Sequence, residues 1–248
     1  MIAPNGTSDS PQAPGLPDPE TVLREADWES LWHSQGSAVA IPDALRALLD
    51  ADPAVQARVM DEDLAPLRLE TFIYPAAVPA AQYMAAILPD PRIAAIGVYR
   101  HAVDEYRQHP LRAMLLIWLG YLLSHTDDNV KAREEFGGNP SPDEETLFAL
   151  RPAFYQQVAA FLHDDEHEVR YAALFAAIPL AEAPGLTRHQ TELAGCARRL
   201  LATEEDTYRR VRVLNGLMAW GHDTAGLETD DDRRLRTLLN SITTEPSF

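Results

Sequence analysis

The chain of 248 residues is 46% apolar and carries 38 acidic against 21 basic side chains, a formal net charge of −17 at pH 7. Its length fits one elongated array or two small domains with a packed core. A negative charge repels phosphate backbones, so the composition disfavours nucleic acid and favours a basic protein or cationic ligand as partner. Acidity that serves solubility alone is the alternative, and charge by itself does not separate the two.

Cysteine usage and hydropathy predict a cytoplasmic protein without membrane contact. The sequence has one cysteine, Cys196, so no disulfide can form within the chain, which fits a reducing compartment. We expect Cys196 to be a buried apolar group rather than a nucleophile. The longest apolar stretch, 113–123, is too short to span a bilayer, and the N-terminus lacks the pattern of a signal peptide.

The N-terminal part of the sequence divides into a tail and a cap. Residues 1–19 are rich in proline and small polar residues, a composition typical of a disordered tail. Ordered structure is predicted to begin near Glu20, with Trp28 and Trp32 as an aromatic anchor packed on the first repeat. The first regular helix is predicted to start at Ile41, because a proline comes directly after it and is well tolerated in a first helical turn.

The rest of the chain repeats a short pattern, which we call a corner, in which acidic residues precede a β-branched or aromatic residue. We call that last residue the anchor. The anchors are Val55, Ile93, Val130, Val169 and Tyr208, with spacings of 38, 37, 39 and 39 residues. Acidic groups in such a corner can cap a helix and suit its dipole. The clearest copy, 150–183, reads as a helix, a tight acidic turn and a second helix. Such a hairpin cannot bury all its apolar surface alone, so the period indicates stacked helix pairs.

The period predicts a single domain over residues 20–248. Its repeats are expected at 41–74, 75–109, 110–142, 143–184 and 185–224, with a C-terminal cap at 225–248.

Several segments have a particular expected role. Residues 69–74, the one β-like run, are interpreted as an irregular connection between repeats. Residues 111–123 are expected to form the most buried helix, and a short second helix should come after the corner at 127–130. The polar stretch 137–142 is a break that serves as a hinge, as a functional loop or as a tolerated insertion. A last helix is expected at 233–242, capped by the preceding acidic triplet.

The pattern Glu166-His167-Glu168-Val169-Arg170-Tyr171-Ala172-Ala173 resembles the HEAT-repeat consensus, and residues 28–45 resemble the opening segment of bacterial HEAT-like proteins. The arginine of the pattern is missing after three of the anchors. The resemblance implies an all-α fold, an α-solenoid superhelix of about five HEAT-like helix pairs with an N-terminal cap and a short C-terminal helix. It also implies a role in protein interaction or in immunity, the neutralisation of a toxin.

In such an array the second helices usually line the concave side. Side chains of the last two that packing does not require are the candidate binding residues: Arg170, Tyr171, Arg209, Arg212, Asn215 and Trp220. For Arg170 and Arg209 a structural role is favoured, as a ladder between repeats paired with carboxylates of the turns. Tyr171, Arg212 and Trp220 are the better candidates for binding.

No catalytic residue, metal ligand or cofactor is assigned from the sequence. His163 to His167 matches the H-x-x-E-H pattern of zinc peptidases, but it straddles a predicted turn, whereas the chemistry needs both histidines on one helix. No Gly-rich phosphate loop and no G-x-S-x-G pattern is present.

Three functions are possible as hypotheses. The first is a non-catalytic module that binds a protein or peptide, such as a basic toxin, on its concave face. The second is an enzyme that acts on a small molecule or peptide in a pocket of that face. The third is a HEAT-like DNA glycosylase that uses Arg198, Arg199, Arg209, Arg210 and Arg212 as a basic stripe, which the overall charge disfavours.

Overall fold

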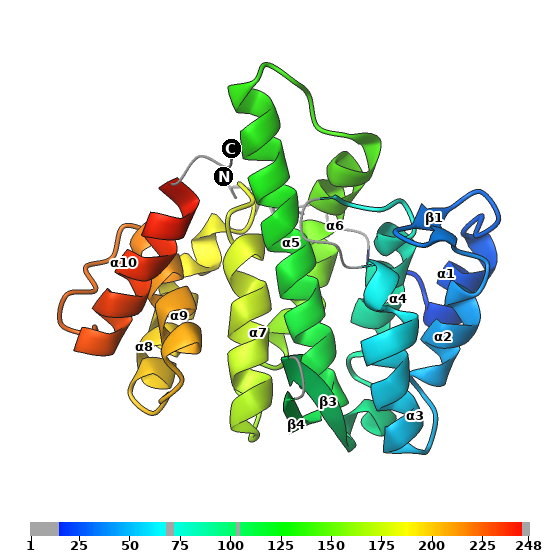
Figure 1. Cartoon of the computed structure of the whole chain (residues 1–248), viewed down its shortest axis with the longest axis horizontal. Coiled ribbons are helices and arrows are strands. Elements are labelled where there is room, and N and C mark those ends of the chain that lie inside the picture. The colour runs from blue at the N-terminus through cyan, green and yellow to red at the C-terminus, as the bar shows by residue number, and fades with distance from the viewer. Residues whose placement is uncertain (1–14, 68–71, 103–104, 245–248) are drawn as a thin grey trace, which may run out of the picture.

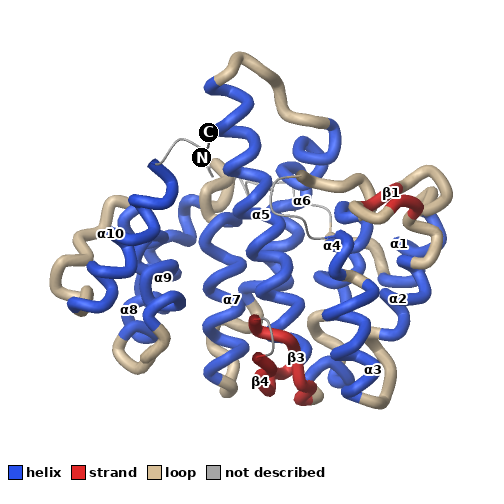
Figure 2. Tube along the Cα trace, in the orientation of Figure 1, coloured by secondary structure: helices blue, strands red, loops and turns tan. Residues whose placement is uncertain are grey.

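The computed structural model describes residues 15–67, 72–102 and 105–244. These residues are mostly helical, with few short strands, as the sequence predicts (Figures 1 and 2). None of the described helices is both long and apolar enough to cross a membrane. The superhelical solenoid arrangement stays a prediction.

The N-terminal region starts with a helix that the sequence analysis placed later. Helix α1 (Pro19–Glu25) begins one residue before Glu20, and the Asp18 side chain caps it by accepting from the Thr21 N–H over 3.0 Å. Of the predicted tail, residues 1–14 lie outside the described residues. A hairpin of two-residue strands comes next: β1 (Trp32–His33) and β2 (Gly36–Ser37). Trp28 is buried as expected, whereas Trp32 is half exposed and contacts Phe72 and Tyr74.

The first predicted helix pair is present in shortened form. Helix α2 (Ile41–Ala47) begins where predicted, but it is the second helix of the chain. Helix α3 (Pro53–Arg58) starts at the predicted corner, where Asp52 caps it, and continues into a π-helical turn, η1 (Val59–Asp63). A 3₁₀ turn, η2 (Ala65–Leu67), comes next. Of the predicted connection 69–74, residues 69–71 lie outside the described residues.

The second predicted pair is wrong in its second half. Helix α4 (Ala77–Ile87) leads into a 3₁₀ turn, η3 (Pro91–Ala94), and then into a β-hairpin of β3 (Ile96–Ala102) and β4 (Glu105–Pro110). The strands pair antiparallel, with Ile96 opposite Pro110 and Tyr99 opposite Arg107. Exposure alternates along β3, with Ile96 and Val98 exposed and Gly97 and Tyr99 buried. This period of two, with β-branched and aromatic residues, is typical of a strand.

The third predicted pair is also wrong, because its expected corner lies inside a helix. Helix α5 (Leu111–Glu135) runs without interruption through 127–130. Asp127 pairs with the buried Arg151 of a neighbouring helix, so its carboxylate serves a tertiary ion pair instead of a cap. The helix ends at Glu135. The chain then turns at Gly137, whose φ of 74° suits glycine, and the Gly138 N–H donates to the Arg133 carbonyl over 2.7 Å.

The corners in the C-terminal half are confirmed. Helix α6 (Pro142–Ala159) begins with a capping box between Ser141 and Glu144, after the predicted polar break. Helix α7 (His167–Leu180) comes after the acidic turn and completes the predicted hairpin. A 3₁₀ turn, η4 (Thr187–His189), then precedes α8 (Gln190–Leu201) and α9 (Thr207–Ala219), which is capped by Asp206.

The last helix, α10 (Asp230–Thr244), is longer than the predicted 233–242 and packs on α9. The acidic triplet lies in its first turn. Thr229 and Asp232 cap this end reciprocally: the Asp232 N–H donates to Thr229 Oγ1 over 3.2 Å, and the Thr229 N–H donates to Asp232 Oδ2 over 2.8 Å.

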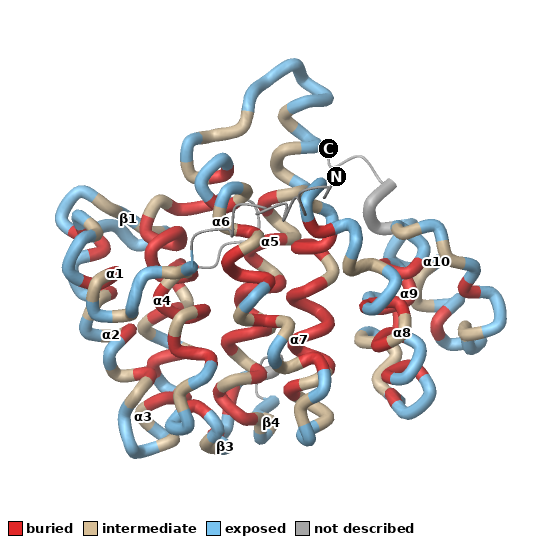
Figure 3. The backbone as a smooth tube through the Cα atoms, turned by 180° about the vertical axis from the view of Figure 1, so that it is seen from behind, coloured by how far each residue is buried: buried red, intermediate tan, exposed pale blue. Residues whose placement is uncertain are grey.

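Helices α4, α5, α7 and α9 stand side by side in Figure 1, with the β3–β4 hairpin at the lower end of α5 and α7. Figure 3 shows how deeply α5 and α7 are buried, and Leu115, Leu116 and Leu119 of α5 are fully buried, as predicted for this segment. These two helices approach closely because α5 has a glycine at the contact: a β-carbon on Gly120 would lie 2.5 Å from the Phe175 ring. The contact places aromatic side chains of both helices beside a pocket that the hairpin also borders.

Candidate functional site

A pocket of about 880 Å³, which we call the central pocket, lies where β3, β4, α5, α7 and α9 meet. Its volume falls within the usual range for ligand sites. Helix α5 supplies an apolar wall with Ala113, Met114 and Ile117, while the other elements contribute mostly polar and aromatic side chains. The pocket therefore combines apolar surface with a few polar groups, as ligand sites commonly do.

The polar centre of the central pocket is Glu168, in the first turn of α7. Arg209 of α9 holds its carboxylate with two hydrogen bonds of 2.7 Å, from Nη1 to Oε1 and from Nη2 to Oε2. His109 of β4 places Nδ1 3.0 Å from Oε2. Burial by itself would raise the pKa of Glu168, but the hydrogen bonds from His109 and Arg209 outweigh burial and hold this pKa well below its usual value. Glu168 is therefore a fixed anion that joins three elements.

Arg212, one turn further along α9, has a different environment. Its guanidinium carbon lies 4.7 Å from the ring centre of Tyr121 and 4.9 Å from that of Phe175. The two rings contact each other at 5.1 Å between centres. Arg212 is exposed and forms no ion pair with any described residue. Stacking on two rings fixes the plane of the cation and leaves its N–H edge open.

Two buried tyrosines complete the walls. Tyr171 of α7 is 5% exposed, and the Arg209 guanidinium carbon lies 4.6 Å from its ring centre. Tyr99 of β3 is 1% exposed, and its hydroxyl has no hydrogen-bond partner among the described residues. Burial raises the pKa of both phenols above the usual value, so both keep their protons at neutral pH.

Three of the six predicted binding residues line the central pocket: Tyr171, Arg209 and Arg212. The pocket lining does not include Arg170, Asn215 or Trp220. Asn215 is exposed on α9, and Trp220 ends that helix and packs against the core.

The predicted pairing of two arginines with carboxylates of the turns is confirmed for Arg209 and wrong for Arg170. Arg209 joins α9 to Glu168 of α7, a carboxylate beside the preceding turn. Arg170 instead donates from Nη1 to the backbone carbonyls of Asp164 and Asp165, over 2.7 Å each. It thus closes its own turn, because the orphan carbonyls after a helix end are strong acceptors.

Sequence reasoning missed the contribution of the hairpin. Tyr99, Arg100 and His109 reach the central pocket from β3 and β4, which the period of the corners assigned to a helix. The alternation from Ile96 to Tyr99 was the available signal. Nothing in the linear sequence links Glu168 to His109, which lies 59 residues earlier (168 − 109).

The H-x-x-E-H pattern lies across a turn, as predicted. His163 belongs to the turn after α6, and His167 is the first residue of α7. The His167 Nε2 atom lies 3.0 Å from Glu204 Oε2, a carboxylate of the next turn. Within the described residues, no group of three or more His, Cys, Asp or Glu side chains is arranged to hold a metal ion.

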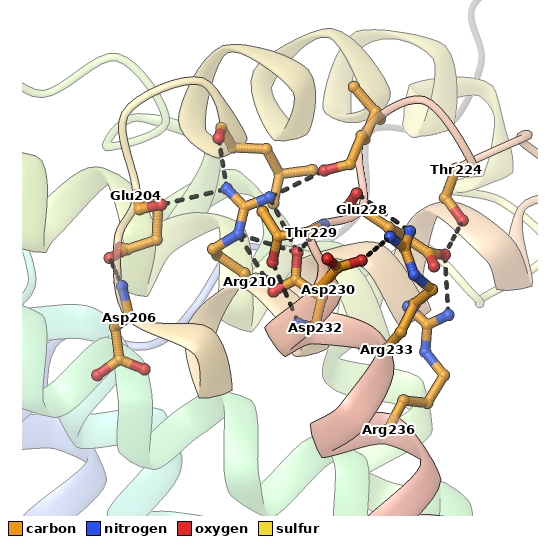
Figure 4. A network of polar contacts seen from close by, with 12 residues as sticks. Glu204, Asp206, Arg210, Thr224, Glu228, Thr229, Asp230, Asp232, Arg233 and Arg236 are labelled. Carbon is orange, nitrogen blue, oxygen red and sulfur yellow. Dashed lines mark hydrogen bonds and ion pairs between the residues drawn. The ribbon is translucent and has the colours of Figure 1, made fainter.

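The five arginines considered as a basic stripe for DNA binding differ in their burial. Arg210 is 8% exposed, does not line the central pocket and lies against Asp232 of α10 (Figure 4). Its guanidinium donates to both carboxylate oxygens of Asp232 and to the backbone carbonyls of Leu201, Glu204 and Leu227. Arg209 is paired with Glu168, so two of the five arginines of the stripe are held in ion pairs within the protein.

Comparison with known proteins identifies no relative: no family model, no curated protein and no solved structure matches the chain. The resemblance to HEAT repeats therefore stays a prediction.

Proposed function

We propose that the protein is a non-catalytic binding module that takes up a segment of a protein or peptide in the central pocket, on the face formed by α5, α7 and α9. The predicted superhelical stacking of helix pairs, with this face on its concave side, is part of the proposal. Tyr208 is 65% exposed where it borders the pocket, and Arg212 is exposed beside it on α9. Aromatic and arginine side chains over an apolar wall are the types that anchor protein interfaces.

The observation that carries the proposal is that the carboxylate at the centre of the pocket is paired with basic side chains of the pocket walls. Glu168, its central carboxylate, is tied to both Arg209 and His109, and its lowered pKa makes it a weak base at neutral pH. Asp206 accepts from the Arg209 N–H as the cap of α9. These contacts stiffen the walls before any partner arrives, and pre-organised walls reduce the entropy lost on binding.

The charge of the partner is a separate part of the proposal. A net charge of −17 supports a basic partner, such as the toxin expected from the resemblance, for the acidic outer surface. The central pocket differs from that surface, because Arg212 lines it without a carboxylate partner among the described residues. A partner that fits both the acidic outer surface and the pocket would be basic overall and would insert a group that is not basic into the pocket.

A peptide-display selection tests the binding function. Random peptides are selected on the wild-type protein and then screened on Met114→Trp, in which the indole occupies the space beside α5. We expect enriched peptides that bind the wild type and lose binding to the variant, while both proteins show the same circular dichroism. An absence of enriched peptides, or peptides that bind both proteins equally, would contradict the proposal.

The pair of His109 and Glu168 supports a second candidate, an enzyme with a pocket in the same place. A carboxylate on Nδ1 orients an imidazole so that its other nitrogen can act as a general base. The described residues that line the pocket include no Ser, Thr or Cys, so such a base would act on water or directly on a substrate. Turnover of a panel of chromogenic esters, abolished in His109→Gln, would support this candidate. Rates equal to those in buffer for the wild type would dismiss ester hydrolysis.

A further inference from the structure

The central pocket carries a positive charge that its own walls do not neutralise. Three guanidinium groups line it, from Arg100, Arg209 and Arg212, against the two carboxylates of Glu168 and Asp206. The charge of Arg209 is already paired with that of Glu168. The backbone N–H of Arg100 donates to the Asp61 carboxylate over 2.8 Å, whereas Arg212 forms no ion pair with any described residue. In a chain with a net charge of −17, this is a local site for an anion.

Arg212 is the better positioned of the two cations. Its guanidinium is stacked on Tyr121 and Phe175, and those rings are held in place by the close contact between α5 and α7. A stacked guanidinium presents two parallel N–H groups in a fixed plane, which match the two oxygens of a carboxylate. Little side-chain entropy then remains to be lost when such a ligand binds.

Tyr99 borders the pocket, but its hydroxyl is not available to a ligand there. The oxygen is buried without a partner among the described residues and lies beside Gly97, where a β-carbon would be 2.9 Å from it. The apolar wall of Met114 and Ile117 is suited to a hydrocarbon group next to an anion bound at Arg212.

Together these groups define the chemical class of the ligand. We propose that the central pocket recognises a carboxylate attached to an apolar group, with Arg212 as the cation that receives the carboxylate. This inference rests on the proposed binding function and names the group that the partner inserts. The carboxylate can belong to an acidic side chain or C-terminus of a peptide, or to a free small molecule, and the experiment separates these sources.

The small-molecule arm uses two probes of the same shape, 3-phenylpropionate and 3-phenylpropionamide, at millimolar concentration. Saturation-transfer NMR with the intact protein reports which of them binds. We expect a signal from the carboxylate that exceeds that of the amide, that is lost in Arg212→Gln and that is weakened in Arg212→Lys, because lysine keeps the charge without the planar pair of donors. Arg198→Gln, which removes one exposed arginine of α8 outside the pocket, is the matched control and should keep the signal.

The peptide arm uses the sequences selected in the display experiment. If the source is a peptide, they contain an Asp or Glu, or end in a free carboxylate, and replacing that group by its amide weakens binding to the wild type about tenfold or more. The same replacement should have little effect on binding to Arg212→Gln, because the cation is then already absent.

The failure of this inference can be distinguished from the failure of the binding function. Selected peptides that need the pocket but contain no carboxylate would overturn the inference and leave the binding function standing. Equal NMR signals from acid and amide, or no signal from either together with carboxylate-free peptides, would also overturn it. Tyr99→Phe is a second control: it should leave binding of the carboxylate unchanged and unfold at the same or a higher temperature, since it removes an unpaired buried hydroxyl.

Discussion

Arg209 of α9 and Glu168 of α7 are joined by two parallel hydrogen bonds of 2.7 Å, which fix the distance between two helices that border the central pocket. His109 shares the same carboxylate from β4, so one anion connects a strand and two helices. The shape of the pocket therefore depends on this carboxylate more than on any of its other polar groups.

Replacement of Glu168 should reveal this dependence in the stability. Glu168→Gln removes the nearer of the two carboxylates that face Arg209 and leaves Glu204 Oε2 at 3.7 Å from Nη1, and we expect the free energy of unfolding at pH 7 to fall by about 2 kcal/mol. Urea denaturation measures the difference. Glu192→Gln, at an exposed position of α8, is the control and should change stability by less than about 0.5 kcal/mol. An equal loss in both variants would contradict the proposed role of Glu168.

The same carboxylate predicts a pH dependence. Its pKa is lower in the folded protein than in the unfolded chain, so its stabilising contribution is complete above the unfolded value of about 4.3. The contribution declines as pH falls from there toward the folded pKa. The stability difference between wild type and Glu168→Gln should therefore be constant from pH 6 to 7 and shrink progressively below about pH 4. A difference that grows on acidification would show that the pKa shift has the opposite sign.

Two helix glycines should respond to alanine in opposite directions. A β-carbon on Gly120 would lie 2.5 Å from the Phe175 ring, whereas on Gly195 of α8 its nearest neighbour would be Arg199 Nη1 at 3.6 Å. We expect Gly120→Ala to lower the free energy of unfolding by about 1–3 kcal/mol through overpacking. Gly195→Ala should raise it by about 0.5–1 kcal/mol through helix propensity. Thermal unfolding of both variants tests the close contact between α5 and α7, which a stable Gly120→Ala would disprove.

The buried ion pair of Arg210 and Asp232 should hold α10 on α9. Asp232 is fully buried, and its loss leaves an uncompensated guanidinium, so Asp232→Asn should cost about 3 kcal/mol. Hydrogen exchange of residues 230–241 should accelerate in this variant more than exchange in α7. Asp231→Asn, at an exposed neighbouring position, should leave both quantities unchanged. Uniform acceleration across the chain would indicate global destabilisation instead of a detached helix.

Cys196 should be a slowly reacting thiol. It is buried in α8, and burial raises its pKa despite the contact from Arg199 Nη2, which lies 3.2 Å from Sγ. The thiolate is the reactive form, so modification by a disulfide reagent at pH 8 should be much slower in the folded protein than in urea. Similar rates under the two conditions would show that the thiol is accessible.

The sequence predicted the helical class and the C-terminal corners because those features depend on local chemistry. Asp206 and the residues before Val169 mark real turns, and the apolar period on either side forms real helices. The corner at 127–130 had the same local appearance, but its Asp127 pairs with Arg151 from 24 residues further along the chain. Local patterns do not distinguish a capping aspartate from one that is used in a tertiary ion pair.

The candidate site was predictable only in part for a similar reason. Tyr171, Arg209 and Arg212 were selected because they lie on second helices and have side chains typical of binding surfaces. Their partners come from elsewhere: His109 from a strand in a segment predicted to be helical, and Tyr121 from α5, which was predicted as the most buried helix and not as a binding surface. A pocket assembled from segments so distant in the chain leaves no spacing pattern in the sequence.

The most direct test of the account is the dissociation constant of the best selected peptide, measured by calorimetry for the wild type and for Met114→Trp. If the central pocket is the binding site, the filled pocket should weaken binding about 100-fold or more, which is about 2.7 kcal/mol. Equal dissociation constants for two equally folded proteins would place the binding site elsewhere and contradict the account.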